Sequence, residues 1–394
     1  MDIKRTKPQH SCRLTGHALW PFRGISATTS FSCVEGIFAD AGITINGNNS
    51  YDIRIKDERF YKRIMRDGSL GLGESYVDGW WDCESLVDFF FKLMPTDPQD
   101  KMKRNLKLIM LSAVLNMNCK SKAFQIGERH YDLGNELFQL MLDKRMLYSC
   151  AYWKDASTLD DAQEAKMDLI CRKIGLKPGD KILDIGCGWG GFVKYAAEKF
   201  GIKAVGITVS KNQAELASEI CRGLPIEIRL QDYRDLNEKF DHIVSIGMLE
   251  HVGHKNYRAY MQTVHKCLKD DGLFLLHTIG DSYTKTVMEP WMDKYIFPNS
   301  LIPSMKQVSA AAEKLFVIED WHNFGIYYDR TLMSWFANFD KNWNKLKERH
   351  DDRFYRMWKY YLLSCAGTFR SRCQQLWQIV LSKKGVPGGY ESVR

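Results

Sequence analysis

The 394-residue sequence predicts an α/β protein, with a doubly wound parallel sheet and a helical cap, preceded by a small, mainly helical N-terminal domain. A short apolar run at residues 181–185 is followed by glycines and then by a helical pattern at 192–200, as in a strand–turn–helix unit. Apolar runs and helical patterns keep alternating up to residue 278, which is typical of parallel sheets. Residues 280–370 are too long for a plain connection, so we expect them to form a helical cap over the site.

The composition is that of a globular protein with a large core, since 45% of the residues are hydrophobic and 12% are aromatic. No window approaches the roughly 20 apolar residues that span a bilayer. No apolar stretch follows the N-terminal charges, so a secretory signal is not expected. The eleven cysteines form no Cys-x-x-Cys pair, which favours reduced thiols in a cytoplasmic enzyme. The net charge of +8 suits an anionic partner, such as nucleic acid or an acidic membrane surface.

The N-terminal part divides into an extension and a small domain. Residues 1–31 lack periodicity and are expected to be a poorly ordered extension. Residues 32–118 are expected to form a domain that binds lipid or membrane. Its expected elements are a helix at 34–41, a strand at 51–55, a helix at 59–66, a tightly packed glycine- and aromatic-rich turn region at 68–83, and a helix at 84–94. For the turn region, phosphate binding is the alternative.

A basic segment closes this domain. Residues 101–122 contain six basic residues and no acidic one, around the apolar run 108–115. This pattern predicts a segment that lies on an anionic membrane, and a solvated helix with one core face is the alternative. Residues 119–160 are expected to be a linker with helices that cover the substrate and cofactor, including a helix at about 123–142.

Residues 161–383 are expected to form the α/β domain, and residues 384–394 a tail. Ser210 is expected to cap the helix that follows the second strand. After the first strand, the expected elements are strands at 204–208, 226–230, 242–246, 273–278, 317–321 and 376–382, and helices at 211–221, 255–268 and 304–315 and within 329–366, with a further helix at 162–174 before that strand.

The glycine-rich turn reads Asp184-x-Gly186-x-Gly188-x-Gly190, with the acidic residue before the first glycine. Dinucleotide-binding folds instead use Gly-x-Gly-x-x-Gly, with the acidic residue about 20 positions later. The order in this chain resembles motif I of the class I S-adenosylmethionine (SAM) methyltransferases. An ordinary glycine-rich turn is the alternative.

Polar or flexible residues follow four strands, whose carboxyl ends meet at one edge of the predicted sheet. Gly186 and Gly188 are expected to admit the methionine part of SAM, and Gln213 to hold ribose hydroxyls. Asp232 is expected to accept a hydrogen bond from the adenine amino group, with Tyr233 stacking nearby.

The full set of residues expected to bind SAM is Tyr148, Ser149, Asp184, Gly186, Cys187, Gly188, Gly190, Thr208, Ser210, Gln213, Asp232 and Tyr233. One feature departs from the class, because many of its members carry an acidic residue at the end of the second strand. Here residues 206–210 carry none, so hydroxyl groups, backbone and Gln213 are expected to substitute.

A longer set of motifs is more specific than the turn alone. Taken together, they closely resemble the bacterial cyclopropane-fatty-acyl-phospholipid synthase family, from about Ser32 to Leu381. The resemblance includes the N-terminal domain, which the related mycolic acid cyclopropane synthases lack. The motifs occur in order at residues 69–76, 130–135, 148–153, 184–191, 249–253, 276–280, 321–325 and 365–370.

The resemblance implies transfer of a methylene group from SAM to the cis double bond of acyl chains in membrane phospholipids. The alkene takes the methyl group, and a bound bicarbonate removes a proton from the resulting carbocation so that the ring closes. Five residues match the bicarbonate site of the family, and Cys365 matches the cysteine traditionally assigned to its active site. The five are Cys150, Glu250, His277, Ile279 through its backbone, and Tyr328.

Residue types alone support these roles less strongly. Without the resemblance, His277 is best interpreted as a core histidine and Glu250 as a possible helix cap. Because Tyr327 is adjacent to Tyr328, the sequence leaves open which of the two tyrosines matches the bicarbonate site of the family. Cys365 is expected to pack in the wall, because no charged neighbour in sequence would lower its pKa. No metal site is expected, since no further ligands accompany His251 and His254.

The expected partner is a phospholipid bilayer with unsaturated chains and an anionic surface, with no nucleic acid. The resemblance also suggests a homodimer, peripheral on the inner face of the cytoplasmic membrane. Two other hypotheses remain open. One is a SAM methyltransferase that acts on a lipid or small molecule without ring closure, and the other is a catalytically silent protein that binds lipid or nucleic acid.

Overall fold

The computed structural model describes residues 27–96 and 134–394. Helix α1 (Ala27–Asp40) begins five residues before the expected domain boundary at residue 32, so residues 27–31 belong to a helix and not to an irregular extension. The basic segment 101–122 lies outside the described residues, as does most of the helix expected at 123–142. Only α8 (Asn135–Met141) represents that helix.

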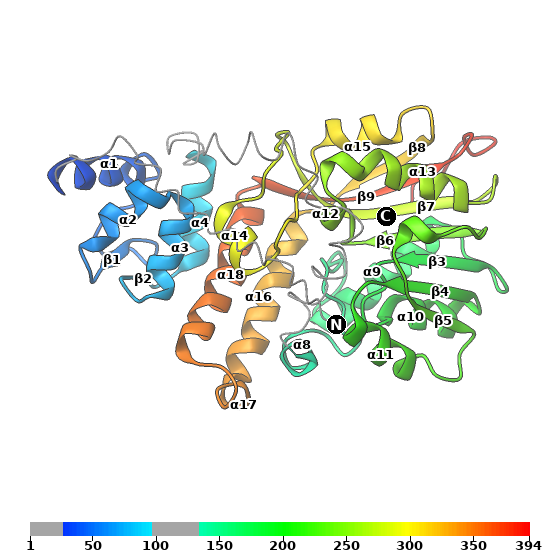
Figure 1. Ribbon diagram of the computed structural model, residues 1–394, viewed down its shortest axis with the longest axis horizontal. Coiled ribbons are helices and arrows are strands. Elements are labelled where there is room, and N and C mark those ends of the chain that lie inside the picture. The colour runs from blue at the N-terminus through cyan, green and yellow to red at the C-terminus, as the bar shows by residue number, and fades with distance from the viewer. Residues whose placement is uncertain (1–26, 97–133) are drawn as a thin grey trace, which may run out of the picture.

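The N-terminal domain, at the left of Figure 1, is a group of short helices around a two-stranded antiparallel sheet. Its core is aromatic, and the buried Trp81 indole donates hydrogen bonds to Leu72 O at 3.0 Å and Ser75 Oγ at 3.2 Å. After α1 its elements are β1 (Ile53–Ile55), α2 (Arg59–Asp67), α3 (Ser69–Val77), β2 (Trp81–Cys83), α4 (Leu86–Leu93) and the short helix η1 (Met94–Thr96).

Residues 68–83 are tightly packed as predicted, but the prediction that they form turns is wrong, because most of this stretch forms α3 and β2. Glycine disfavours helices in isolation, but here it allows close packing. A Cβ on Gly73 would lie 2.3 Å from Cδ1 of Trp291, which belongs to α14 (Pro290–Tyr295). Helix α3 therefore needs Gly73 because α14 packs directly on its backbone at that position.

We expect Gly73→Ala to lower the melting temperature, with a loss of about 1–3 kcal/mol typical of an overpacked core. The same substitution at Gly36 in α1 is the matched control, since nothing lies within 4 Å of a Cβ there. Gly36→Ala should be neutral or slightly stabilising, because alanine favours helices. Thermal unfolding of both variants checks the prediction, and equal melting temperatures would contradict it.

The larger sheet has seven strands in the order β5-β4-β3-β6-β7-β9-β8. Strands β3 to β7 pair in parallel, whereas β9 pairs antiparallel with both β7 and β8. The sheet is therefore mixed, whereas the sequence predicted an entirely parallel one. The strands are β3 (Lys181–Ile185), β4 (Lys203–Thr208), β5 (Ile226–Leu230), β6 (His242–Ile246), β7 (Leu273–Asp281), β8 (Val317–Asn323) and β9 (Gln374–Ser382).

The reversal of β9 follows from where its chain enters. Its first residue, Gln374, pairs with Asp281 at the carboxyl end of β7, and its last residue pairs with the start of β7. The preceding helix, α18 (Asp352–Arg370), belongs to the cap at that carboxyl edge. The chain therefore enters the sheet from the cap side and must run against β7.

Helices cover both faces of the sheet, as a doubly wound fold requires (Figure 1). Neighbouring strand residues alternate between two cores, so Ile182 packs with α9 and α10, whereas Leu183 packs with α13 and α15. Ser210 caps α11 by accepting from Gln213 N, which confirms that expectation. These helices are α9 (Leu159–Lys173), α10 (Gly191–Phe200), α11 (Lys211–Ile220), α12 (Leu249–Val252), the short η2 (Tyr233–Asp235) and η3 (His254–Asn256), α13 (Tyr257–Cys267) and α15 (Met305–Ala312).

The expected helical cap is present and joins the two parts of the molecule. Helices α16 (Ile326–Lys341), α17 (Trp343–Leu346) and α18 stand between the sheet and the N-terminal domain in Figure 1. Gly367 of α18 brings this helix against α4, because a Cβ there would lie 2.5 Å from Val87 O. Among the described residues, none of the helices has the length and apolarity needed to cross a membrane.

Residues 384–394, expected to be a tail, are attached to the α/β domain. The Tyr390 hydroxyl donates to Lys173 O at 2.8 Å. The Arg394 guanidinium donates two hydrogen bonds of 2.6 Å to the carboxylate of Asp320 on β8. This segment therefore covers part of one face of the sheet.

Candidate functional site

The glycine-rich turn links β3 to α10 through left-handed backbone. Gly186, Gly188 and Gly190 have φ of 86°, 55° and 81°, a region that side chains with a Cβ rarely adopt. Gly190 is also packed from outside, since a Cβ would lie 3.0 Å from Cys221 Sγ. The turn therefore presents bare backbone and the first N–H groups of α10 at the carboxyl edge of the sheet.

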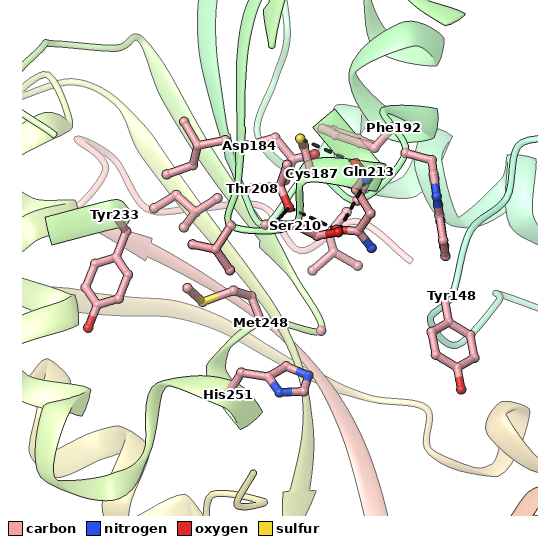
Figure 2. Close-up of a pocket in the computed structure, with 18 of the residues that line it drawn as sticks. Tyr148, Asp184, Cys187, Phe192, Thr208, Ser210, Gln213, Tyr233, Met248 and His251 are labelled. Atoms are coloured by element: carbon pink, nitrogen blue, oxygen red, sulfur yellow. Dashed lines mark hydrogen bonds between the residues drawn. The ribbon is translucent and has the colours of Figure 1, made fainter. Parts of the chain in front are cut away.

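A pocket opens at this edge, over the ends of β3, β4 and β6 (Figure 2). Eleven of the twelve residues expected to bind SAM line it, and Gly190 is the one that does not. Among the lining residues that were not predicted are Met146, Phe192, Met248 and His251. They carry apolar or aromatic side chains that no polar motif distinguishes from core residues. For Phe192, Met248 and His251, the one signal was a position close after a strand end, whereas Met146 lies in the loop after α8.

One wall of the pocket is a small hydrogen-bond network, drawn as dashed lines in Figure 2. The Thr208 hydroxyl donates to Gln213 Oε1 at 2.9 Å and accepts from Ser210 N at 3.2 Å. Because the Gln213 carbonyl is used in this way, the amide nitrogen remains as the donor toward the pocket, as Figure 2 shows. Many class members carry an acidic residue at the end of the second strand. In this chain the hydroxyl groups of Thr208 and Ser210 and the amide of Gln213 occupy that position.

The two acidic residues of the pocket differ in environment. Asp184 is 2% exposed, and burial raises its pKa to about 7 although Lys166 opposes the shift. The Asp232 carboxylate accepts from Arg234 N at 2.9 Å and so caps the turn at the end of β5. The Tyr233 ring packs edge-to-face on Tyr260 with centroids 5.1 Å apart, and Tyr233 also lines the pocket.

A second group of polar side chains gathers where β7 continues beyond β6. Strand β6 ends at Ile246, opposite His277, and the N–H of Ile279 on the same side of β7 is left without a strand partner. It donates instead to Glu250 Oε1 at 2.7 Å. The structure thereby joins two of the predicted residues directly.

Both Glu250 and His277 retain a buried polar atom without a partner in the described part of the chain, namely Glu250 Oε2 and His277 Nε2. Burial raises the pKa of Glu250 to about 7 and lowers that of His277 well below its usual value. His277 is therefore neutral. Gln378 Nε2 lies 3.3 Å from its Nδ1, and with this amide as donor the ring proton is on Nε2.

Tyr328 on α16 lies beside the same group, since Cys150, Glu250 and Cys365 all contribute to raising its pKa, after burial as the main cause. Its ring packs on Phe369 with centroids 4.5 Å apart. The neighbouring Tyr327 points elsewhere and packs on Tyr152 at 5.5 Å. The structure therefore brings Tyr328, and not Tyr327, to the predicted residues.

Neither cysteine of the group resembles a nucleophile. Burial raises the pKa of Cys365 to about 12 and that of Cys150 further still, so both are thiols at neutral pH. The Cys150 thiol lies 3.3 Å from Ala151 O, to which it can donate. In residues 27–96 and 134–394, no three His, Cys, Asp or Glu side chains are grouped as metal ligands would be.

Comparison with known proteins identifies the family. Residues 118–379 match the family model described as mycolic acid cyclopropane synthetase. The chain is also 50% identical over 361 residues to the cyclopropane-fatty-acyl-phospholipid synthase of Escherichia coli K12, covering 91% of this chain and 94% of that one. The chain belongs to this family. It is therefore an enzyme of the cyclopropane synthase family, and the match to the E. coli protein includes the N-terminal domain.

Solved structures agree with this assignment. The cyclopropane synthase MmaA2 of Mycobacterium tuberculosis matches with a TM-score of 0.63 and 32% identity, over 66% of this chain and 98% of its own. Mycolic acid cyclopropane synthase CmaA1, solved with SAH and CTAB, matches with a TM-score of 0.62 and 33% identity over the same shares. Coclaurine N-methyltransferase, at 21% identity and a TM-score of 0.66, shares the fold. The α/β part is thus a SAM-dependent methyltransferase fold.

Proposed function

We propose that this protein transfers a methylene group from SAM to the cis double bond of unsaturated acyl chains in membrane phospholipids and forms a cyclopropane ring. The family and the similarity to the E. coli enzyme over both domains support SAM-dependent cyclopropanation of a lipid. The observation that carries the finer proposal is the pair of unpartnered buried atoms, Glu250 Oε2 and His277 Nε2, beside the glycine-turn pocket. Methyl transfer to the alkene leaves a carbocation, and the ring closes when a base removes a proton from the new methyl group, so a buried site that can hold a proton acceptor fits this chemistry.

SAM supplies an electrophilic methyl group on a sulfonium when it is bound. The glycine turn lets that ligand approach the backbone, while the amide of Gln213 and the carboxylate of Asp232 are suited to hydroxyl and amino groups. Tyr148 also lines this pocket, and its hydroxyl lies 2.7 Å from that of Tyr361 on α18. Tyr148 therefore connects the donor pocket to the cap.

Bicarbonate is the proposed base, and the residues present fit a small oxyanion. Neutral His277 with its proton on Nε2 can donate to it, and Glu250 can share a proton with it because its pKa of about 7 is near physiological pH. Bicarbonate supplies a proton acceptor when it is bound. The residues proposed to hold it are Cys150, Glu250, His277, Ile279 and Tyr328.

The surrounding wall is rich in aromatic rings. Tyr148 packs on Phe138 and Trp335 with centroids 5.2 and 5.1 Å apart, and His277 packs on Phe324 at 5.9 Å. An alkene is a weak nucleophile, so its reaction depends on positioning and on excluding water. The faces of these rings can also stabilise a developing carbocation.

Incubation of the protein with SAM and liposomes of cis-unsaturated phospholipid tests the proposal. Mass analysis of the acyl chains should show a gain of one CH₂ together with loss of the olefin. A methylated chain that keeps its olefin would instead support methyl transfer without ring closure. That alternative has support from the probable fatty acid methyltransferase of Pseudomonas putida, which is 37% identical over 66% of this chain.

We also propose a peripheral position on the inner face of the cytoplasmic membrane, supported by the basic residues of 101–122. Neutralising Lys101, Lys103, Arg104 and Lys107 should weaken binding to anionic liposomes, and unchanged binding would exclude that segment. A homodimer is a further prediction, which light scattering of the purified protein would test.

A further inference from the structure

Helix α9 carries two lysines that are fully buried, Lys166 and Lys173, with 0% and 1% of their surface exposed. A buried ammonium group is costly unless it has partners, so each lysine requires an explanation. Lys173 lies 3.1 Å from His322 Nδ1 and 3.5 Å from Asp320 Oδ2, under residues 384–394. Lys166 instead donates to Ser149 Oγ at 2.8 Å, and Ser149 lines the SAM pocket.

The same face of α9 holds the segment that contains Ser149. One turn before Lys166, Gln163 donates from Nε2 to Leu147 O at 3.2 Å and to Ser149 O at 2.9 Å. Residues 147–150 belong to no helix or strand, so side chains such as these determine their position. The segment matters because it delivers Tyr148 and Ser149 to the pocket and places Cys150 beside Tyr328.

The charge of Lys166 is surrounded by functional groups. The acidic groups that face Lys166 are Asp143, from the loop after α8, and Asp184, from β3 just before the glycine turn. The Cys150 thiol also faces Lys166. The positive charge of Lys166 contributes to lowering the pKa of His277 and so to keeping it neutral. Burial lowers the pKa of Lys166 to about 8, while the two carboxylates oppose the shift. Asp143 accepts from Leu147 N at 2.8 Å and from Arg145 N at 2.9 Å, so this charge cluster is attached to the same segment.

We propose that Lys166 is a positioning residue for the donor pocket, which fixes Ser149 and thereby the wall that SAM contacts. The inference rests on the proposed function, because it takes the pocket to bind SAM. Lys166 does not line the pocket itself and acts through the hydroxyl of Ser149. Lys173 has the same burial and the same helix but no partner in the pocket, which makes it the matched control.

The experiment measures binding of S-adenosylhomocysteine by calorimetry for the wild type, Lys166→Met, Lys173→Met and Ser149→Ala, each with a melting curve. Methionine keeps the length of lysine without its charge. We expect Lys166→Met to weaken binding by about tenfold, as loss of a charge-assisted hydrogen bond does. Lys173→Met should lower the melting temperature to a similar extent and leave the dissociation constant unchanged.

A double variant separates positioning from general stability. Combining Lys166→Met with Ser149→Ala should weaken binding no more than the stronger single variant, because both remove one interaction. Additive losses, or equal binding by Lys166→Met and Lys173→Met, would overturn the inference. If Lys166→Met does not fold, Ser149→Ala decides alone, since unchanged binding in that variant also overturns it. A wild type that binds no S-adenosylhomocysteine would contradict the proposed function itself.

Discussion

Glu250→Gln should lower kcat for cyclopropanation by about 100-fold or more, the scale expected for a group that acts in proton transfer. The amide oxygen can still accept from Ile279 N, so the local fold should persist. The substitution removes the carboxylate oxygen that has no partner and the pKa of about 7 that lets it share a proton. Binding of S-adenosylhomocysteine should stay the same, because Glu250 does not line that pocket.

The control for this variant is Asp320→Asn, which changes another buried carboxylate in the same way. Asp320 is paired with Arg394 and Lys173 and lies outside the site. We expect it to lower the melting temperature and to change kcat by no more than a few fold. Should Glu250→Gln keep wild-type activity with phospholipid vesicles, the proposed bicarbonate site would be wrong.

Glu74→Ala should lower the free energy of unfolding by about 3 kcal/mol, as expected when a buried ion pair loses one partner. Glu74 is 8% exposed and joins the N-terminal domain to the cap segment. It accepts from Arg63 at 2.6 Å, from the Tyr295 hydroxyl at 2.8 Å and from Lys294. Urea unfolding measures the loss. Asp57→Asn, which breaks the solvent-exposed pair with Arg59, is the control and should cause no measurable loss.

The loss should depend on pH in a defined direction. These partners hold the pKa of Glu74 at about 2, below its usual value of 4.5. The stabilisation is therefore complete above about pH 4.5 and is lost as the pH falls toward 2. A second variant, Glu74→Gln, removes the charge and keeps the size of the side chain. The difference in the free energy of unfolding between wild type and Glu74→Gln should shrink over that pH range. A difference that stayed constant from pH 7 to pH 2 would contradict the role of the ionised carboxylate.

Local patterns in the sequence were sufficient where one short stretch determines the structure. The run 181–191 predicts its strand, turn and helix, and Ser210 its cap, because neighbouring residues make those hydrogen bonds. Long-range packing was not predictable in this way. The helix α3 depends on α14, more than 200 residues later, and nothing near residue 374 indicates that β9 runs backwards.

The same distinction applies to the site. Strand ends predicted much of the lining of the donor pocket because the carboxyl ends of parallel strands meet at one edge of the sheet. Residues such as Gln163 and Lys166 were missed because a polar side chain on a helix normally indicates a solvated face. Only the tertiary fold shows that this face of α9 is turned inward, onto residues 147–150.

The reversed strand has a consequence for how the protein forms during synthesis. Strands β3 to β7 and the glycine turn lie within residues 181–281, so the donor pocket can assemble while the chain is still growing. Strand β9 pairs with β7 and β8 only after the cap helices have been made. A ribosome-bound chain that ends before residue 374 would expose one edge of each of these strands, a state prone to aggregation. Binding of SAM would then precede completion of the chamber in which the lipid reacts.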